Sequence, residues 1–324
     1  MAVYVNTNYS ALQGQRYLGN VQNQLTTTYQ RLSSGMRINS AKDDAAGLQI
    51  ADRLTSQING LNQGNRNASD GIALAQTAEA GMDEISGMLQ KMRTLAVQAN
   101  NGTNTKEDKQ ALSKEASALA TEITRIAQQT TFAGKTILNG KQTNSIDPLP
   151  GGQAPGPGPG GGGAGDPQSI TLQVGSNKGD TISFNLVNLQ FSKAAIDGKV
   201  DANLFGDANT NDKLFKKSAD GKSMTVVFTA AGGPEAMIDA MDKMIGYVDS
   251  QRADLGAIQN RLESSIRNQS NVAANEADAR SRIRDADFAE ESANLSQQSI
   301  IQQAAASMLM QANTRPQLGL SLLG

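Results

Sequence analysis

The residues with the most chemistry to offer are charged, and they gather in two short stretches. The first stretch is RLSSGMRINSAKDDAAGLQIADRL at residues 31–54, and its charged residues are Arg31, Arg37, Lys42, Asp43, Asp44, Asp52 and Arg53. The second is RSRIRDADFAEE at residues 280–291, with Arg280, Arg282, Arg284, Asp285, Asp287, Glu290 and Glu291. Mixed cations and carboxylates form ion pairs and hydrogen bonds, within a chain or between chains. Taken alone, the second stretch also fits a solvated helix face with local ion pairs.

Catalytic chemistry is poorly supported by the composition. The 324 residues include no histidine, cysteine or tryptophan. The chain therefore lacks thiol nucleophiles, disulfides, the commonest metal ligand and the usual general base near neutral pH. We expect no enzyme activity, no catalytic or metal site and no cofactor. The absence of cysteine also fits a chain that enters oxidising surroundings without cross-linking.

Two further motifs resemble ligand sites but lack essential residues. GGGGAG at residues 160–165 follows prolines instead of a strand and has no Lys-Ser/Thr, so we interpret it as a linker and not as a nucleotide loop. GDANTND at residues 206–212 spaces Asp207, Asn209 and Asn211 like calcium ligands. The sixth and twelfth positions of that loop are Asp212 and Ser218 instead of Gly and Glu, which disfavours calcium.

Charge and hydropathy also narrow the choice of partner. A formal net charge of -2 and a pI of about 5.4 provide no basic field for nucleic acid or for an acidic membrane surface. The first residues, MAVYVNTNYSALQGQRYLGN, lack the basic flank and apolar region of a secretory signal, and no segment resembles a membrane span. We expect a chain that is soluble or is exported by another route.

The two ends of the chain are nearly free of charge. Residues 1–30 contain only Arg16, and residues 292–324 contain only Arg315. Spacings of three and four predict one helix with an apolar face at each end, from Leu18, Val21, Leu25 and Leu32, and from Leu295, Ile301, Ala305, Met308 and Ala312. Because water disfavours such a face, the simplest partner for each end is the other. Alternatively the ends are frayed tails, and both interpretations hold if the helices form on assembly.

Three longer periodic segments lie inward of the ends. Apolar residues between Leu54 and Leu95 predict one helix of roughly 45 residues. Residues 106–129 predict a second helix with Thr105 as its N-cap, and a third helix runs from Pro234 to about Asn275. The turn NNGTNT at residues 100–105 makes the first two helices antiparallel, and the third completes a bundle.

The centre of the chain has a different pattern. Alternating apolar residues predict strands at 170–174 and 182–186, joined by the turn GSNKGD, and a further strand at 223–228. Residues 147–167 are rich in Gly and Pro and predict an exposed spacer. The predicted fold class is mainly α: an elongated, coiled-coil-like bundle formed by both chain ends, with a small β-rich central region.

The expected segments follow the chain in order. They are a terminal core helix with its linker (1–44), the N-terminal half of the bundle (45–140), the spacer (141–168), a β-hairpin packed on the bundle (169–189), a small variable outward region (190–232), the C-terminal half of the bundle (233–284) and a second terminal core helix (285–324).

Several ordered motifs together resemble one protein family. MAVYVNTN, the stretch 31–54, RNASDGIALAQTAEAGMDEI, LQKMRTLAVQAN, TFAGKTILNG, SQRADLGAIQNRLESSI, ARSRIRDADFAEE and the final SLLG closely resemble bacterial flagellin, the subunit of the flagellar filament. The resemblance covers about residues 1–140, the piece LQVGSNKGDTISFNL and residues 234–324. Residues 141–168 and 190–232 lie outside it, as expected of the family's divergent outer region.

The resemblance implies a structural protomer of the flagellar filament, the helical propeller for swimming motility. Such a chain is exported unfolded through the flagellar type III apparatus and is extracellular, in the bacterial flagellum. The implied partners are other copies of the chain, an export chaperone that holds Ile300 to Leu323, the filament cap and hook-filament junction proteins, and host Toll-like receptor 5. Neither nucleic acid nor a membrane is implied.

Three groups of site residues follow from the resemblance. Filament-core assembly is assigned to Leu18, Val21, Leu25, Leu32, Leu295, Ile301, Met308 and Leu309. Contacts in the link between core and outer layer are assigned to Arg31, Arg37, Lys42, Asp43, Asp44, Arg282, Arg284 and Asp285. Receptor binding is assigned to Lys91, Leu95 and Glu115, although Lys91 stands where relatives often have Arg, which differs from Lys at a bidentate contact.

Two other functions compete with this interpretation. A hook-filament junction protein shares the terminal helices but would not form long filaments alone. An enzyme is a further alternative because some flagellins carry hydrolase insertions, but the centre of the chain is too small for one and has no His or Cys.

Overall fold

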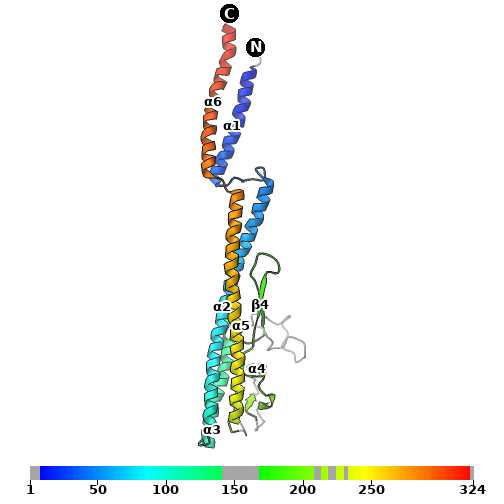
Figure 1. Ribbon diagram of the computed structural model, residues 1–324, viewed down its shortest axis with the longest axis vertical. Helices are drawn as coiled ribbons and strands as arrows, with labels where there is room; N and C mark the ends of the chain where they lie inside the picture. The colour runs from blue at the N-terminus through cyan, green and yellow to red at the C-terminus, as the bar shows by residue number, and fades with distance from the viewer. Residues whose placement is uncertain (1–7, 141–167, 208–212, 218–223, 230–232, 322–324) are drawn as a thin grey trace. The chain divides into compact units, whose positions relative to one another are not determined.

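The computed structural model describes residues 8–140, 168–207, 213–217, 224–229 and 233–321. Helices make up most of this part of the chain (Figure 1). They are α1 (Tyr9–Ser34), α2 (Ala45–Ala99), α3 (Lys106–Gln129), α4 (Phe191–Asp197), α5 (Gly233–Arg284) and α6 (Phe288–Ser321), with a short 3-10 turn, η2 (Ala202–Leu204). None of the helices in these ranges is long and apolar enough to cross a membrane.

The strands are short and form three small sheets. They are β1 (Thr131–Phe132), β2 (Lys135–Thr136), β3 (Gln168–Gln173), β4 (Thr181–Leu186), β5 (Phe205–Asp207), β6 (Phe215–Lys217) and β7 (Met224–Val226). β1 and β2 form an antiparallel hairpin, as do β3 and β4. In the third sheet, β6 lies between β5, to which it is parallel, and β7, to which it is antiparallel.

The chain folds as two compact units, each of which combines segments distant in sequence. The first unit contains residues 1–59 and 271–324, and the second contains residues 60–270. The chain passes from one unit to the other within α2 and again within α5. The chain ends, α1 and α6, therefore belong to the same unit, together with the segments that follow α1 and precede α6.

The second unit is built on a bundle of α2, α3 and α5 (Figure 1). Its core contains fully buried side chains from all three helices, among them Met82, Ile85, Leu89, Ile123 and Met241. Ion pairs join the helices at the surface, from Arg252 on α5 to Asp83 on α2 at 3.1 Å. The fold class predicted from periodicity is confirmed: the protein is mainly α-helical, with a small central strand region.

The helix boundaries test the sequence patterns directly. α3 spans the predicted residues, and Thr105 forms a capping box with Asp108, in which each side chain accepts from the other residue's backbone N–H. Both long helices extend further than predicted: α2 has 55 residues and α5 has 52. The residues added at the end of α5, 276–284, are mostly polar, so apolar periodicity alone missed them.

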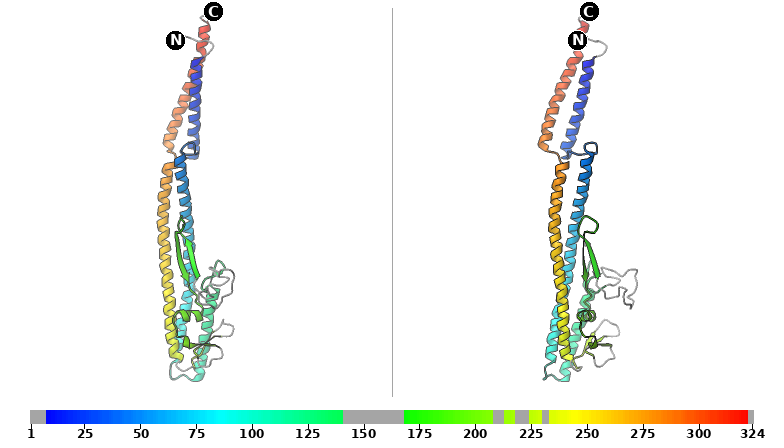
Figure 2. Two further views of the ribbon diagram at one scale, coloured as in Figure 1. Left: turned by 90° about the vertical axis from the view of Figure 1, so that its right-hand side faces the viewer. Right: turned by 45° about the vertical axis from the view of Figure 1, so that its right-hand side comes forward.

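The β3–β4 hairpin packs against α2 because α2 has glycines where the two backbones meet (Figure 2). A Cβ on Gly64 would lie 2.0 Å from the carbonyl oxygen of Val174, far inside van der Waals contact. Asn67, one turn along, donates from Nδ2 to the Gln173 carbonyl at 2.8 Å. The predicted strands at 170–174 and 182–186 are confirmed, with Ile170 opposite Phe184 in the register.

The outward region after the hairpin contains more structure than the pattern predicted. The strand expected at 223–228 forms as β7, and α4, β5 and β6 form as well, between residues 191 and 217. Phe215 on β6 stacks on Phe205 at 5.0 Å and meets Phe191 of α4 edge-on at 5.4 Å. Ser117 and Ser113 of α3 accept hydrogen bonds from the backbone of Val226 and Phe228. The spacer at 141–167 and the calcium-like positions Asn209 and Asn211 lie outside the described residues.

Candidate functional site: the paired chain ends

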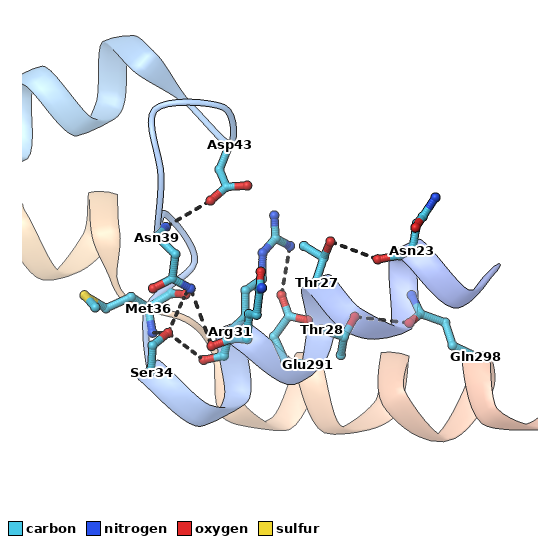
Figure 3. Close-up of polar contacts among 11 residues, drawn as sticks. Asn23, Thr27, Thr28, Arg31, Ser34, Met36, Asn39, Asp43, Glu291 and Gln298 are labelled. Atoms are coloured by element: carbon cyan, nitrogen blue, oxygen red, sulfur yellow. Dashed lines mark hydrogen bonds and ion pairs between the residues drawn. The ribbon is translucent and has the colours of Figure 1, made fainter. Parts of the chain in front are cut away.

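The two terminal helices lie side by side and run in opposite directions (Figure 1). Near the start of α1, Asn8 donates from Nδ2 to the carbonyl oxygen of Ala312, late in α6, at 2.8 Å. Near the end of α1, Thr28 donates from Oγ1 to Oε1 of Gln298, early in α6, at 3.1 Å (Figure 3). The prediction that each chain end is the partner of the other is therefore confirmed.

The contact between α1 and α6 follows a heptad pattern. The buried and half-buried positions of α1 recur at alternating spacings of three and four: Ala11, Gly14, Leu18, Val21, Leu25, Thr28 and Leu32. The corresponding positions of α6 are Glu291, Leu295, Gln298, Gln302, Ala305, Leu309 and Ala312. This is the spacing by which two helices interlock side chains along a seam. Many members of the seam are small or polar, so it buries little apolar area for its length.

The large apolar side chains of this helix pair lie mostly outside the seam. On α1 the exposed ones are Tyr9, Leu12, Tyr17 and Tyr29, and on α6 they are Phe288, Ile300, Met308 and Met310. Ile300 and Met310 are each 67% exposed. At about 100° per residue around a helix, Ile300, Met308 and Met310 point in three different directions. α6 therefore presents apolar side chains around most of its circumference, while α1 covers one side.

The sequence pattern assigned one apolar face to α6, and it placed Met308 wrongly on that face. The spacing placed Met308 in the same stripe as Leu295 and Ala305, yet Met308 is 70% exposed. Its neighbour Leu309 takes the seam position, where its Cδ1 lies 3.2 Å from the Cβ position of Gly14. Spacings of three and four allow either neighbour to face inward, and Gly14 on α1 leaves room for Leu309 at this point of the seam.

One ion pair joins the two helices at their inner ends. Arg31 on α1 donates from Nη1 to Oε1 of Glu291 on α6 at 3.0 Å (Figure 3). Glu291 is buried and Arg31 is partly buried, so water screens this pair less than a surface pair. Glu291 was absent from the predicted site residues. Its signal in the sequence was a carboxylate in the first turn of a helix that is otherwise almost uncharged.

Backbone hydrogen bonds connect the segment after α1 to the break between α5 and α6. Gly35 ends α1 in the left-handed conformation, at a φ of 69°, and accepts from the Ala286 N–H at 3.0 Å. Arg37 then donates its backbone N–H to the Arg284 carbonyl at 2.7 Å, and its guanidinium donates to the Ile283 carbonyl at 2.8 Å. The two charged stretches therefore do meet, through main-chain groups more than through opposite charges.

The aspartates of these stretches start helices and hold turns. Asp43 accepts from the backbone N–H of Asn39 (Figure 3) and from that of Ser40. Those hydrogen bonds, with Ser40 first, hold the pKa of the Asp43 carboxyl below its usual value. Asp44 accepts from the Gly47 N–H at 2.9 Å in the first turn of α2, and Asp287 accepts from the Ala289 N–H at 2.9 Å in the first turn of α6.

The other predicted linker residues face outward or pair locally. Lys42 is exposed. Arg282 forms an exposed ion pair with Asp278 of its own helix at 2.9 Å. Asp285 accepts from the Ser281 hydroxyl at 2.7 Å. Ile38 is buried, and its Cδ1 lies close to Gly47 in the first turn of α2, so it anchors the linker, a role that its single apolar position did not reveal in the sequence.

The predicted receptor residues lie in the other unit, on the bundle. Lys91 on α2 and Glu115 on α3 are both exposed and form an ion pair at 3.1 Å. Leu95 is only 6% exposed and belongs to the hydrophobic core of the bundle. In the free chain, a partner can therefore reach the two charged residues more easily than the leucine.

The fold and the site define the chain as an α-helical protein with paired ends and a separately packed helical bundle. Residues 5–143 match the bacterial flagellin N-terminal helical region, and residues 238–323 match the bacterial flagellin C-terminal helical region. The chain belongs to the bacterial flagellin family. This is a family of structural subunits of the flagellar filament, in agreement with the predictions that the chain resembles flagellin and is not an enzyme.

Relatives match along the whole chain. Flagellin A of Vibrio cholerae is 40% identical, and the match covers 100% of both chains. Flagellin D of Vibrio anguillarum is 37% identical and polar flagellin C of Vibrio parahaemolyticus is 36% identical, each again over 100% of both chains.

Solved structures give a weaker likeness. The crystal structure of Bacillus cereus flagellin aligns with a TM-score of 0.44 and 25% identity, over 65% of this chain and 94% of that chain. A putative flagellar hook-associated protein from Vibrio parahaemolyticus aligns with a TM-score of 0.52 and 17% identity, over 75% of this chain and 100% of that chain. At this identity the second likeness supports the fold alone.

The Arg31–Glu291 pair is predicted to hold α1 against α6. Glu291→Gln keeps the side chain volume but removes the charge that balances the partly buried Arg31, so it should weaken the pairing by about 1 to 2 kcal/mol. Amide hydrogen exchange in α1 and α6 of the free subunit measures this as faster opening. Asp278→Asn, in the exposed pair with Arg282, is the matched control and should leave the exchange unchanged. Equal exchange in the two variants would contradict a special role for Glu291.

Proposed function

We propose that the chain polymerises into the flagellar filament through α1 and α6, whose outer apolar side chains are covered by other copies of the same chain. The observation that carries this proposal is the distribution of apolar residues around α6. A helix with apolar side chains around most of its circumference is favoured when it is buried on several sides, and α1 covers only one side of α6. Ile300, Met308 and Met310 then need a further partner.

The composition of both helices supports the same partner. Burying a charge without a partner is unfavourable, so a surface that becomes an assembly core is expected to lack charges. Outside the Arg31–Glu291 end, α1 contains only Arg16, and residues 292–324 contain only Arg315. Since every copy carries the same two helices, a second copy offers a surface of matching chemistry.

The linker supports an oriented contact between copies. Surface ion pairs contribute only about 0 to 1 kcal/mol each, so apolar burial supplies the cohesion and the charges set orientation. Lys42 and Arg282 are exposed on the subunit and are candidates for such contacts. A repeated contact between different surfaces of identical chains produces an open helical polymer, which distinguishes a filament subunit from a junction protein of limited copy number.

We also propose that the chain leaves the cell through the flagellar export apparatus, with a chaperone on α6 before export, and that it contacts the filament cap and hook-filament junction proteins outside. Membership of the flagellin family supports this route. The exposed apolar residues of α6 support a chaperone, because uncovered side chains of this kind promote aggregation.

Recognition by Toll-like receptor 5 is proposed for the bundle surface around Lys91 and Glu115. Both side chains are exposed and carry opposite charges within one ion pair, which offers a partner a donor and an acceptor side by side. Because Leu95 is buried in the bundle core, we propose that it supports this surface from within the core and makes no direct contact with the receptor.

Assembly is tested by truncation and by one surface substitution. Deletion of residues 1–30 or 295–324 should leave a soluble bundle that forms no filaments in electron micrographs. Ile300→Asn should raise the critical concentration for polymerisation by about tenfold with little change in subunit stability, because the side chain is exposed before assembly. Gln303→Asn, at an exposed polar position three residues along, is the control. Normal filaments from either truncated chain would exclude the proposed role of the ends.

The export route is tested in living bacteria. The full chain should appear in the medium of cells with a working flagellar export apparatus and remain in the cytoplasm of cells without one, as membership of the flagellin family leads us to expect. Blocking the Sec machinery should not alter export of the chain. A Sec-dependent periplasmic protein in the same cells should no longer reach the periplasm. Accumulation in the periplasm that depends on Sec would contradict the proposal.

Receptor recognition is tested with charge removal on the bundle. The double variant Lys91→Ala, Glu115→Ala should weaken signalling by monomers about tenfold, since both groups are exposed and their loss spares the core. The double variant Glu122→Ala, Arg125→Ala, another exposed pair on α3, is the control. Leu95→Asp is a poor test because it places a charge in the core and unfolds the bundle. Equal signalling by the two double variants would remove the assignment.

A further inference from the structure

We propose that Met308 and Met310 form an oxidation site, at which a peroxide converts the free subunit into a form that cannot polymerise. The proposal rests on the assembly role of α6 proposed above. It adds a chemical regulation of that surface, with hydrogen peroxide or an organic hydroperoxide as the reagent.

Met308 and Met310 are more exposed than the other methionines that the structure describes. Met308 is 70% exposed and Met310 is 67% exposed. Within the described ranges, the remaining methionines are buried or partly buried: Met36, Met82, Met88, Met92, Met224, Met237, Met241 and Met244. Oxidation of a thioether follows its accessibility. The chain has no cysteine, so no thiol competes for the oxidant.

The chemical step is a two-electron oxygen transfer. The sulfur lone pair attacks one peroxide oxygen, a sulfur–oxygen bond forms and the oxygen–oxygen bond breaks. The sulfur is oxidised to a sulfoxide, and the peroxide is reduced to water, or to an alcohol from a hydroperoxide, after proton transfer to the leaving oxygen. The product is a polar side chain with a strong hydrogen-bond acceptor in place of a flexible apolar one.

The positions of the two residues make this change costly for assembly. Met308 and Met310 are about 200° apart around α6, so they project on nearly opposite sides of the helix. Neither side chain is covered by α1 in the subunit. In a polymer that surrounds α6, both sulfoxide oxygens would be removed from water, and an acceptor buried without a donor is unfavourable. In the free subunit the same oxygens remain hydrated, so the fold is spared.

The same geometry predicts that assembly protects the site. Once neighbouring copies cover α6, a peroxide no longer reaches either sulfur, and a finished filament resists oxidation at these residues. Methionine sulfoxide reductases restore the thioether, one enzyme for each sulfoxide epimer, so the change is reversible while the chain is still a subunit.

The test uses the purified full chain, hydrogen peroxide and peptide mapping of every methionine by mass spectrometry. Met308 and Met310 should gain oxygen before the buried methionines do. At that stage of oxidation, the critical concentration for polymerisation should rise by about tenfold, and circular dichroism should report an unchanged subunit. Treatment with both sulfoxide reductases should restore the original value.

A Met308→Leu, Met310→Leu variant tests whether the effect of peroxide on polymerisation depends on these two residues. Each protein is compared with its own untreated sample, so any effect of the substitutions on assembly itself cancels. The critical concentration of the variant should be unchanged by peroxide, while that of the original chain rises.

Three results would overturn the inference. They are oxidation of the buried methionines as fast as that of Met308 and Met310, normal polymerisation of subunits oxidised at both residues, and equal sensitivity of the leucine variant to peroxide. Failure of the untreated original chain to form filaments would instead refute the proposed function, on which the inference depends.

Discussion

Incomplete burial of the terminal helices is the constraint on which the function of this chain depends. α1 and α6 interlock along a heptad seam made largely of small and polar residues, while tyrosines, Ile300 and two methionines remain outside it. The seam aligns the helices but leaves several large apolar side chains exposed to water. We propose that identical copies cover the apolar side chains that remain exposed and so stabilise the assembled subunit.

The two units differ in how completely they bury their apolar side chains. The bundle of α2, α3 and α5 buries large side chains such as Met82, Leu89 and Ile123 completely, and a capping box begins α3. It therefore needs no further partner to be stable. The unit of the chain ends buries little and keeps its apolar side chains available. Receptor recognition through Lys91 and Glu115 would use the surface of the bundle, and polymerisation would use the paired chain ends.

The two charged stretches supply hydrogen-bond partners for helix ends. A chain that leaves one long helix and starts another exposes main-chain groups that need hydrogen-bond partners. Gly35 ends α1, Asp44 and Asp287 begin the following helices, and Arg37 donates to the carbonyl groups at the end of α5. Arg31 and Glu291 supply the direct charge pair between the helices. The crowding of charge at residues 31–54 therefore reflects helix ends and their connections more than a network of ion pairs.

The sequence by itself determined the helical class, the span of α3, the β3–β4 strands, the pairing of the uncharged ends and the resemblance to flagellin, because periodicity and helix-capping chemistry are local properties. It could not determine that Leu309 faces the seam and Met308 does not, or that Glu291 is the partner of Arg31. It also missed α4 and two strands whose stability comes from Phe191, Phe205 and Phe215 packing together. These features depend on which residues distant in sequence meet, and only the tertiary structure brings those residues into contact.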